Sequence, residues 1–330
     1  MTDIYKQIHT RLEAGKASRL LSRYSKQGIR RTLIEEDRPA AEGGLTFEAA
    51  DDTLTLSEGF APRPRLVILG GGHIAAPLTT FAKRLGFDIW LFDDRPGFAN
   101  PAGFPDAHTV ICDNFTNMST RLQFTPYDYV TILTRGHKHD IFCLEALLNA
   151  SELPQYIGMI GSKRRIAIVK NEVASRITHP ERLEQLHAPI GLPIGSVTPE
   201  EIALSIMAEI VAHKRLGKDG KRAKKPQEGC IDPDLLHWLA HRSEEQAALV
   251  TIVHTSGSTP REVGAKMAVT AEGNIFGSIG GGCAEADVIT RARDVIDQGN
   301  HLLHTIDLAD TAEEDGMVCG GRMQVLIEAL

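Results

Sequence analysis

Short apolar runs alternate with amphipathic stretches through the middle of the chain, from residue 66 to residue 160. Strands are expected at Leu66–Leu69, Phe87–Phe92, Ala107–Cys112, Tyr127–Thr134 and Tyr156–Ile160. Helices are expected at Ile74–Leu85 and Asp140–Asn149. Strands that alternate with helices in this way predict a parallel sheet with helices on both of its faces.

Residues 235–330 follow another pattern, in which strands succeed one another with few helices between them. The strands are expected at Ala248–His254, Lys266–Thr270, Ile275–Ile279, His301–Leu308 and Met323–Ala329. The helices are expected at Leu235–Ala240 and Ala286–Ile296. This pattern indicates a largely antiparallel sheet. The fold class is therefore α/β, with a parallel-sheet domain followed by a smaller α+β domain.

The N-terminal segment shows a helical pattern at Ile4–Leu21 and strand patterns at Arg31–Glu35 and Leu45–Leu56. After the parallel-sheet pattern, Thr198 is expected to cap a helix that runs to about Lys214, with a capping box completed by Glu201. The segment from Lys214 to Pro226 contains seven basic residues, which indicates a solvated linker, with a nucleic-acid-binding arm as the alternative. We therefore divide the chain into residues 1–61, 62–213, 214–234 and 235–330.

Composition narrows the class of protein. The chain has 330 residues, a formal net charge of −7 and 42% hydrophobic residues, as expected for a soluble globular protein. The acidic balance predicts no binding to nucleic acid or anionic membrane. The N-terminus lacks the apolar core of a signal peptide, and no apolar run reaches the roughly 18 residues of a membrane helix. We therefore expect a cytoplasmic protein.

The five cysteines are odd in number, widely spaced and without a C-x-x-C pair. This spacing argues against a zinc ribbon and against a disulfide framework. Cys112 and Cys143 lie in apolar segments and are expected to be inert core residues, and Cys230 follows the basic linker without an expected role. The other two cysteines are considered below.

A glycine loop at Gly70–Ala75 matches the G-x-G-x-x-A pattern between an expected strand and an expected helix. Asp93 stands 23 residues beyond Gly70, at the end of the second strand. In a Rossmann-like fold, such a loop holds a dinucleotide phosphate and such a carboxylate bonds a ribose hydroxyl. We expect Gly70, Gly72, His73 and Asp93 to contact a nucleotide or another phosphate ligand. A glycine turn that serves packing alone is the alternative.

A second loop, Arg135–Asp140, follows the fourth strand at the carboxyl edge of the sheet, where ligands of open α/β folds bind. The types of His137, His139 and Asp140 allow a metal cluster, but their spacing does not place all three on one helix face. We expect a phosphate or ligand contact from His137 and a helix cap from Asp140. A loop histidine without a role is the alternative.

A third loop, Gly161–Arg165, offers backbone N–H groups, a hydroxyl and positive charge at a helix start. These groups suit an anionic ligand, so we expect contacts from Ser162 and Lys163. A solvated basic first turn is the alternative, although its charge opposes the helix dipole.

Cys283 lies between three glycines and an expected helix, in the stretch Gly280–Glu285. A thiol in the first turn of a helix feels the positive end of the helix dipole, which favours the thiolate. Cys319 adjoins two more glycines, and two thiolates in glycine-rich loops suit a soft metal or sulfur transfer. We expect the two cysteines to meet as metal ligands or sulfur carriers. For Cys283 alone, a buried cysteine after a tight turn is the alternative.

Other residues are expected to serve the same site. Glu285, in the first helical turn, would accept a proton or match the helix dipole. Glycines let a ligand approach the backbone closely. Arg261 belongs to the polar loop Thr255–Arg261, which would be ordinary if it stood alone. The expected contacts are Arg261, Gly281, Gly282, Gly320 and Gly321.

Taken together, these motifs resemble those of the XdhC/CoxI family of accessory factors for xanthine and carbon monoxide dehydrogenases. The stretches similar to its CoxI-type domain are His254–Arg261, Gly280–Glu285 and Asp315–Gly321. The stretches similar to its Rossmann domain are Leu66–His73, Thr134–His137, Ile160–Arg165, Pro189–Gly195 and Thr198–Ala203. The family usually places the CoxI-type domain first, whereas here it comes last. We interpret residues 1–61 as a reduced, cysteine-free relative of that domain.

The resemblance implies a chaperone that binds the molybdenum cofactor, a molybdopterin, assists its sulfuration and inserts it into a xanthine dehydrogenase-type molybdenum hydroxylase. It also implies a cysteine desulfurase as sulfur donor, a homodimer, and a maturation factor rather than a turnover enzyme. Cys283 and Cys319 would hold metal or sulfur, and the glycine loops with Lys163 would hold phosphate. An NAD(P)-dependent oxidoreductase built on the Gly70 loop, and a regulatory nucleotide-binding module, are the alternatives.

Overall fold

The chain folds into two compact units, each of which is described by itself. The computed structural model describes residues 2–36, 44–50, 52–216, 231–243, 245–281, 283–307 and 321–330. We call residues 63–223 the Rossmann unit, and residues 1–62 with 224–330 the sandwich unit. The predicted site residues Gly282, Cys319 and Gly320, and also Cys230, lie outside the described residues. No helix within the described ranges is long and apolar enough to cross a membrane.

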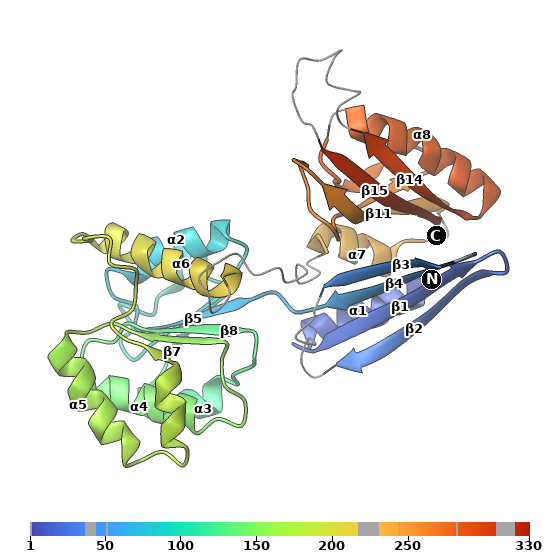
Figure 1. Ribbon diagram of the computed structural model, residues 1–330. Coiled ribbons are helices and arrows are strands. Elements are labelled where there is room, and N and C mark those ends of the chain that lie inside the picture. The colour runs from blue at the N-terminus through green and yellow to red at the C-terminus, as the bar shows by residue number, and fades with distance from the viewer. Residues whose placement is uncertain are drawn as a thin grey trace. The chain divides into compact units, whose positions relative to one another are not determined.

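The Rossmann unit is built on a six-stranded parallel sheet with the strand order β10-β9-β8-β5-β6-β7 (Figure 1). Its strands are β5 (Arg65–Leu69), β6 (Asp88–Asp93), β7 (Thr109–Cys112), β8 (Asp128–Ile132), β9 (Tyr156–Met159) and β10 (Leu186–His187). The chain moves from β5 to one edge of the sheet and then returns to β8, on the other side of β5. The strand order therefore reverses between β5 and β8, which is where open α/β sheets bind ligands.

Helices cover both faces of this sheet, as predicted for a parallel sheet. One face carries α2 (Ala75–Arg84) and α6 (Pro199–Arg215), and the other carries α3 (Met118–Arg121), α4 (His137–Leu148) and α5 (Lys163–Ala174) (Figure 1). Short 3-10 turns lie at Pro101–Gly103, Phe115–Asn117 and Pro180–Gln185. The capping box of α6 is confirmed, because the Thr198 hydroxyl accepts from the Glu201 N–H and the Glu201 carboxylate accepts from the Thr198 N–H.

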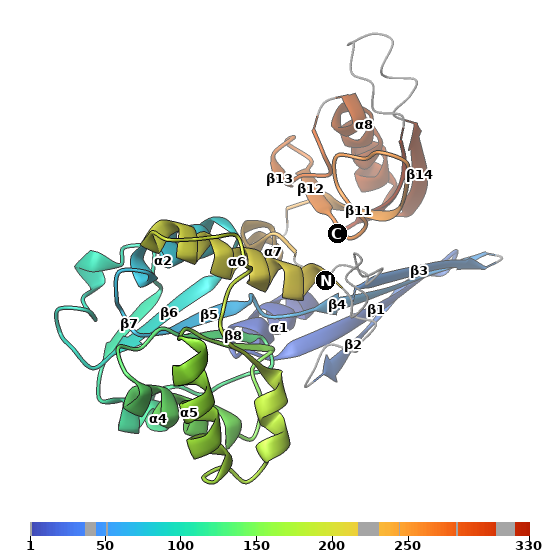
Figure 2. The ribbon, with the colours of Figure 1, turned by 60° about the vertical axis from the view of Figure 1, so that its left-hand side comes forward.

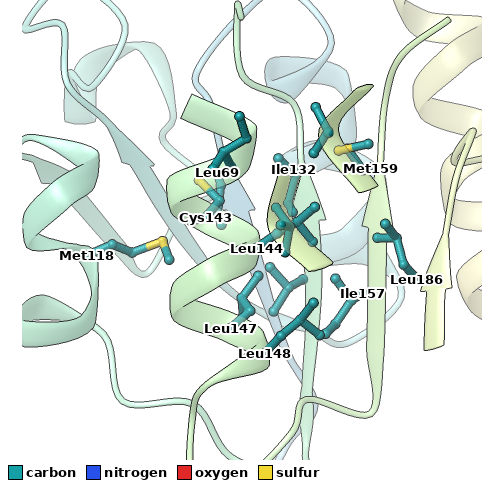
Figure 3. Packing of buried hydrophobic residues seen from close by; sticks show 14 of the residues in the cluster. Leu69, Met118, Ile132, Cys143, Leu144, Leu147, Leu148, Ile157, Met159 and Leu186 are labelled. Atoms are coloured by element: carbon teal, nitrogen blue, oxygen red, sulfur yellow. The ribbon is translucent and has the colours of Figure 1, made fainter. Parts of the chain in front are cut away.

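Buried apolar side chains fill the space between the sheet and α4. Figure 3 shows Cys143 with Leu144 and Leu147 facing the strand residues Ile132 and Ile157. The prediction that Cys143 is a core residue is therefore confirmed. The same prediction is wrong for Cys112, which is exposed because it ends the edge strand β7.

The sandwich unit contains two antiparallel sheets, ordered β2-β1-β4-β3 and β13-β12-β11-β15-β14. The first comprises β1 (Ala17–Ser25), β2 (Gly28–Glu36), β3 (Leu45–Ala50) and β4 (Thr53–Phe60). The second comprises β11 (Ala247–Ser256), β12 (Lys266–Thr270), β13 (Ile275–Gly277), β14 (His301–Asp307) and β15 (Arg322–Ala329), with β13 and β14 at its edges (Figure 2). The helices are α1 (Thr2–Glu13), α7 (Pro233–His241) and α8 (Cys283–Gln298). The predicted α+β class of the C-terminal domain is confirmed.

The two faces of the five-stranded sheet are buried differently. The face with Val250 and Ile252 packs against Val288 and Ala292 of α8. The opposite face packs against α1, α7 and the four-stranded sheet, so that Leu249 shares one cluster with Leu20, Phe60 and Leu235. The N-terminal segment and the C-terminal domain therefore have a common core.

The N-terminal segment differs from its predicted elements. The helix expected at Ile4–Leu21 ends at Glu13, because Gly15 takes a φ of 72° and Ala17 begins β1. Side chains of β1 then alternate between the buried face and the other face, as in a strand packed on one side. The single strand expected at Leu45–Leu56 is instead a hairpin of β3 and β4.

Candidate functional site

The glycine loop after β5 has two glycines fixed by packing and one that borders open space. A β-carbon at Gly70 would lie 2.5 Å from the carbonyl oxygen of Leu133, and Gly70 has a φ of 117°. A β-carbon at Gly71 would lie 1.9 Å from the carbonyl oxygen of Phe98. Around the same position at Gly72, no described atom comes within 4 Å. Only Gly72 therefore offers the free approach to the backbone that a phosphate ligand needs.

Two helices start at the point where the strand order reverses. α2 follows β5 and α4 follows β8, and within the described residues neither helix start is capped by a side chain. Gly136 is the N-cap of α4, which corrects the prediction that Asp140 caps this helix. His73 and His137 are both exposed near these starts. Uncapped first-turn N–H groups and the positive ends of two helix dipoles suit an anion.

Asp140 instead belongs to a buried polar network. Its carboxylate accepts from the Thr134 hydroxyl at 2.6 Å and pairs with the Arg165 guanidinium at 2.6 Å, and it has no exposed surface. Burial raises the pKa of Asp140, although the bonds from Thr134 and Arg165 oppose this shift. Arg165 also donates to the carbonyl oxygen of Thr134. This network ties the loop after β8 to the start of α5.

Asp93 is also engaged within the protein. It is 1% exposed, and its carboxylate accepts from the Gly71 N–H at 2.8 Å. Arg95 donates to both carboxylate oxygens, from its backbone N–H and from its guanidinium. In the described geometry, Asp93 therefore holds the glycine loop in place through hydrogen bonds. A contact of Asp93 with a ribose stays a prediction.

Ser162 and Lys163 lie at the start of α5, as predicted. Ser162 is the N-cap, and its hydroxyl accepts from the Arg165 N–H at 3.2 Å. Lys163 is the first helical residue and is exposed. The cap uses a lone pair of the Ser162 hydroxyl and leaves its O–H donor, and both residues are exposed, so a contact of Ser162 and Lys163 with an anion stays a prediction.

In the sandwich unit, Glu285 anchors the glycine loop before α8. One of its oxygens, Oε1, accepts from the Ser278 hydroxyl at 2.8 Å and from the N–H groups of Gly281, Ile279 and Gly280 at 2.9, 3.0 and 3.2 Å. Burial pushes the pKa of Glu285 upward, but these four donors outweigh it and the pKa is lowered. A carboxylate held in this way shapes the loop, and its low pKa makes it a weak proton acceptor.

The flanks of the two cysteine loops pack against one shared segment. A β-carbon at Gly280 would lie 2.4 Å from Cγ of Pro260, and one at Gly321 would lie 2.1 Å from the carbonyl oxygen of Ser258. Gly280 precedes Cys283 by three residues, and Gly321 follows Cys319 by two. The polar loop Thr255–Arg261 therefore contacts both Gly280 and Gly321, and close packing explains why glycine is needed at both positions.

A cleft of about 320 Å³ opens beside this loop. Its walls include Arg261, Ser278, the buried ion pair of Lys266 with Glu58, and the backbone of Gly44 and Gly59. The N-terminal segment thus supplies one wall and the C-terminal domain supplies the other. The size lies at the lower end of the range for small-molecule sites.

Sequence reasoning missed several residues of this site. Glu58 and Lys266 were not expected to take part, although a lysine at the start of an apolar strand is a signal of a buried partner. Cys283 is the first residue of α8, as its position in the sequence predicts. Arg261 lines the cleft, and Gly281 has a φ of 78° with no described atom within 4 Å of its β-position.

Two family models match this chain. A model of the XdhC Rossmann domain matches residues 66–210, and a model of the XdhC and CoxI family matches residues 240–307. The Rossmann match precedes the match to the XdhC and CoxI family model along the chain.

Relatives of known sequence match about half of the chain. The uncharacterized protein YqeB of Escherichia coli K12 is 33% identical over 164 residues, which are 49% of this chain and 29% of that protein. A protein of Bacillus subtilis 168, named as a probable xanthine dehydrogenase subunit, is 33% identical over 154 residues, 47% of this chain and 44% of that protein. The chain thus spans less than half the length of either relative.

A crystal structure described as a xanthine dehydrogenase from Bacillus halodurans resembles this chain with a TM-score of 0.50 and 28% identity. The match covers 63% of this chain and 65% of that one. Both domain models, the motifs that carry them and the shared fold lead to one conclusion. The chain belongs to the XdhC and CoxI family, with its Rossmann domain placed before its CoxI-type domain.

Proposed function

We propose that this protein is a maturation factor for molybdenum hydroxylases of the xanthine dehydrogenase type. It would bind the molybdenum cofactor as cargo, hold it while a cysteine desulfurase supplies sulfur, and pass it to the hydroxylase. Family membership supports this role, as do the relatives whose names refer to xanthine dehydrogenase.

One observation carries the proposal. Gly280 and Gly321, which flank the two cysteines in the sequence, pack on the same short segment, Ser258–Pro260. The described residues nearest the two cysteines in the sequence therefore contact one segment, and we propose that Cys283 and Cys319 meet there. Two thiolates held near each other are soft donors, and soft donors suit molybdenum and sulfur better than they suit hard cations.

The residues around the loops fit a bulky anionic cargo. Gly281 borders open space, but Glu285 accepts from its N–H, so the backbone donors for the ligand would be the N–H groups of the first turn of α8. Arg261 supplies positive charge at the wall of the cleft. In the Rossmann unit, Gly72 and the starts of α2 and α4 offer a second place for a phosphate group.

The NAD(P)-dependent oxidoreductase remains the alternative function. It would need the Rossmann loop to hold a dinucleotide and Asp93 to recognise its ribose. Asp93, however, is buried and accepts bonds from Gly71 and Arg95 with both oxygens. This arrangement favours the maturation factor over the oxidoreductase.

The test is to purify the full chain from cells that make the molybdenum cofactor and to measure molybdenum and pterin fluorescence. We expect both to copurify with the wild type and with Cys112→Ala, a matched control at an exposed cysteine of the Rossmann unit. Both should be lost from Cys283→Ala. Tight NAD(H) binding with turnover, and no molybdenum in the wild type, would instead establish the oxidoreductase.

A further inference from the structure

The N-terminal segment has the same topology as the core of the C-terminal domain. Each begins with a helix, α1 or α7, that leads into the first strand. The strand order is β2-β1-β4-β3 in one sheet and β12-β11-β15-β14 in the other, and every neighbouring pair is antiparallel. Among the described elements, the C-terminal domain adds β13 at one edge and the helix α8. The two halves of the sandwich unit are therefore two versions of one fold.

The equivalent helices of the two halves contact each other. The His9 ring of α1 lies 5.6 Å from the His237 ring and 5.3 Å from the His241 ring of α7. Ile8 of α1 and Leu239 of α7 belong to one buried cluster. Contact between an element and its own counterpart is what an approximate two-fold axis between the two halves would produce.

Buried charges cross the interface in a reciprocal way. Arg31, on the second strand of the N-terminal sheet, pairs with Glu328, on the last strand of the C-terminal sheet. Lys266, on the second strand of the C-terminal sheet, pairs with Glu58, on the last strand of the N-terminal sheet. All four side chains are at most 9% exposed. Each half thus contributes a basic residue that pairs with an acidic residue of the other half. This reciprocity is the pattern of an isologous interface.

The outer faces of the two sheets explain the difference between the halves. On β11 the outward residues Val250 and Ile252 are apolar and lie under α8. On β1 the corresponding face carries Arg19, Leu21 and Arg23, of which Arg23 is exposed and the other two are half-buried. A sheet that has no helix over it must present polar side chains to water. In the described part of the N-terminal half there is no counterpart of α8, and its sequence also lacks cysteine.

The inner face of the five-stranded sheet carries both partners of the reciprocal pattern, a base at Lys266 and an acid at Glu328. A second copy of the same sheet, related by the same two-fold axis, would place its Glu328 against Lys266 and its Lys266 against Glu328. We infer that this face is a homotypic docking surface for a second copy of the C-terminal domain, and that the N-terminal segment occupies it within the same chain. Because the N-terminal segment takes the place of a second C-terminal domain and has no cysteine, each sandwich unit contains one cysteine site. The segment also blocks self-association through this face. This inference is independent of the cargo.

The test is the substitution Arg31→Glu in the full chain. It places the new carboxylate next to that of Glu328 in a buried position. We expect the population of molecules in which the N-terminal segment has left the five-stranded sheet to increase roughly a hundredfold. The reason is that removing one partner of a buried ion pair is strongly unfavourable. Hydrogen exchange of β1 to β4 should increase, and the mass by sedimentation should rise above that of the wild type. Arg30→Glu, on the opposite side of the same strand, should change neither quantity.

Two further variants keep the test decisive. Arg31→Gln removes the charge without the clash and should give the same changes at smaller amplitude if Arg31→Glu does not fold. The double variant Arg31→Glu with Glu328→Arg should return exchange and mass to wild-type values. Faster exchange in β1 to β4 with an unchanged mass would overturn the docking surface. Unchanged exchange and mass in both single variants would overturn the claim that the reciprocal charges hold the segment in place.

Discussion

The carboxylate of Glu285 holds the glycine loop that leads to Cys283, and its removal can be predicted quantitatively. Glu285→Gln keeps an acceptor oxygen but removes the charge from four hydrogen bonds. Charge-assisted bonds are roughly twice as strong as neutral ones, and water replaces part of the loss at a half-buried loop. We therefore expect the closed loop to lose about 2 kcal/mol, which is roughly a 30-fold rise in its opening.

Hydrogen exchange of the backbone N–H groups of Ile279, Gly280 and Gly281 measures this opening directly. Exchange at these positions should accelerate in Glu285→Gln and stay unchanged in Asp287→Asn. Asp287 is a matched control, because it lies on the same helix and bonds His304 at the surface. Equal exchange rates in Glu285→Gln and the wild type would refute the role of Glu285 as the anchor of the loop.

The pH dependence of the same loop follows from the lowered pKa of Glu285. The carboxylate binds protons more weakly in the folded loop than in the unfolded chain, where its pKa is about 4.3. Its stabilising effect is therefore complete above that value and is lost as the pH falls through the lower, folded pKa. Protection factors of Gly280 and Gly281 should follow this course in the wild type. A flat profile in the wild type, matching that of Glu285→Gln, would contradict it.

Three further predictions concern the Rossmann unit. Gly71→Ala should destabilise the unit by several kcal/mol in urea unfolding, because its β-carbon would overlap the carbonyl oxygen of Phe98. Gly72→Ala should leave the stability unchanged. Equal stability of the two variants would contradict the packing described for Gly71. Asp140→Asn should cost about 1–3 kcal/mol, because it removes the carboxylate that accepts from Thr134 and Arg165 in a buried position, and a loss below about 0.5 kcal/mol would refute this reasoning. In native protein, thiol reagents followed by mass spectrometry should modify Cys112 but not Cys143, whose pKa is raised by burial; labelling of both at one rate would contradict the burial.

Much of the fold could be predicted from local sequence patterns. The strand Lys266–Thr270 has the predicted bounds, and the capping box of Thr198 and Glu201 is present. Each of these features depends on residues within one element or one turn, so the sequence alone contains the information. The parallel sheet could be inferred in the same way, because its strands are short apolar runs separated by helices.

The N-terminal segment could not be predicted in this way. Ala17–Leu21 contains alanine and leucine, which favour helices, but these residues form a strand because Leu20 packs on a sheet more than 200 residues away in the sequence. Tertiary packing overrode the local preference. The same distance along the chain hid the pairing of Glu58 with Lys266 and hence one wall of the cleft.

Residue types in the site were predicted better than residue roles. The motif predicted correctly that Asp93 lies beside the glycine loop. It did not predict that the guanidinium of Arg95, two residues later, donates hydrogen bonds to both oxygens of the Asp93 carboxylate. Glu285 was expected to be a proton acceptor or a dipole-matched charge, and its bonds to three backbone N–H groups depend on the loop conformation. A sequence shows which groups are present, but not which hydrogen bonds already satisfy them.

The central claim is that the loops of Cys283 and Cys319 form one site. The most direct measurement is cross-linking of the native chain with a short bifunctional thiol reagent, followed by peptide mapping. We predict a Cys283–Cys319 cross-link within one chain or between two copies, and its loss when the cofactor occupies the thiols. Ready alkylation of both cysteines by a monofunctional reagent, without any cross-link between them, would contradict it.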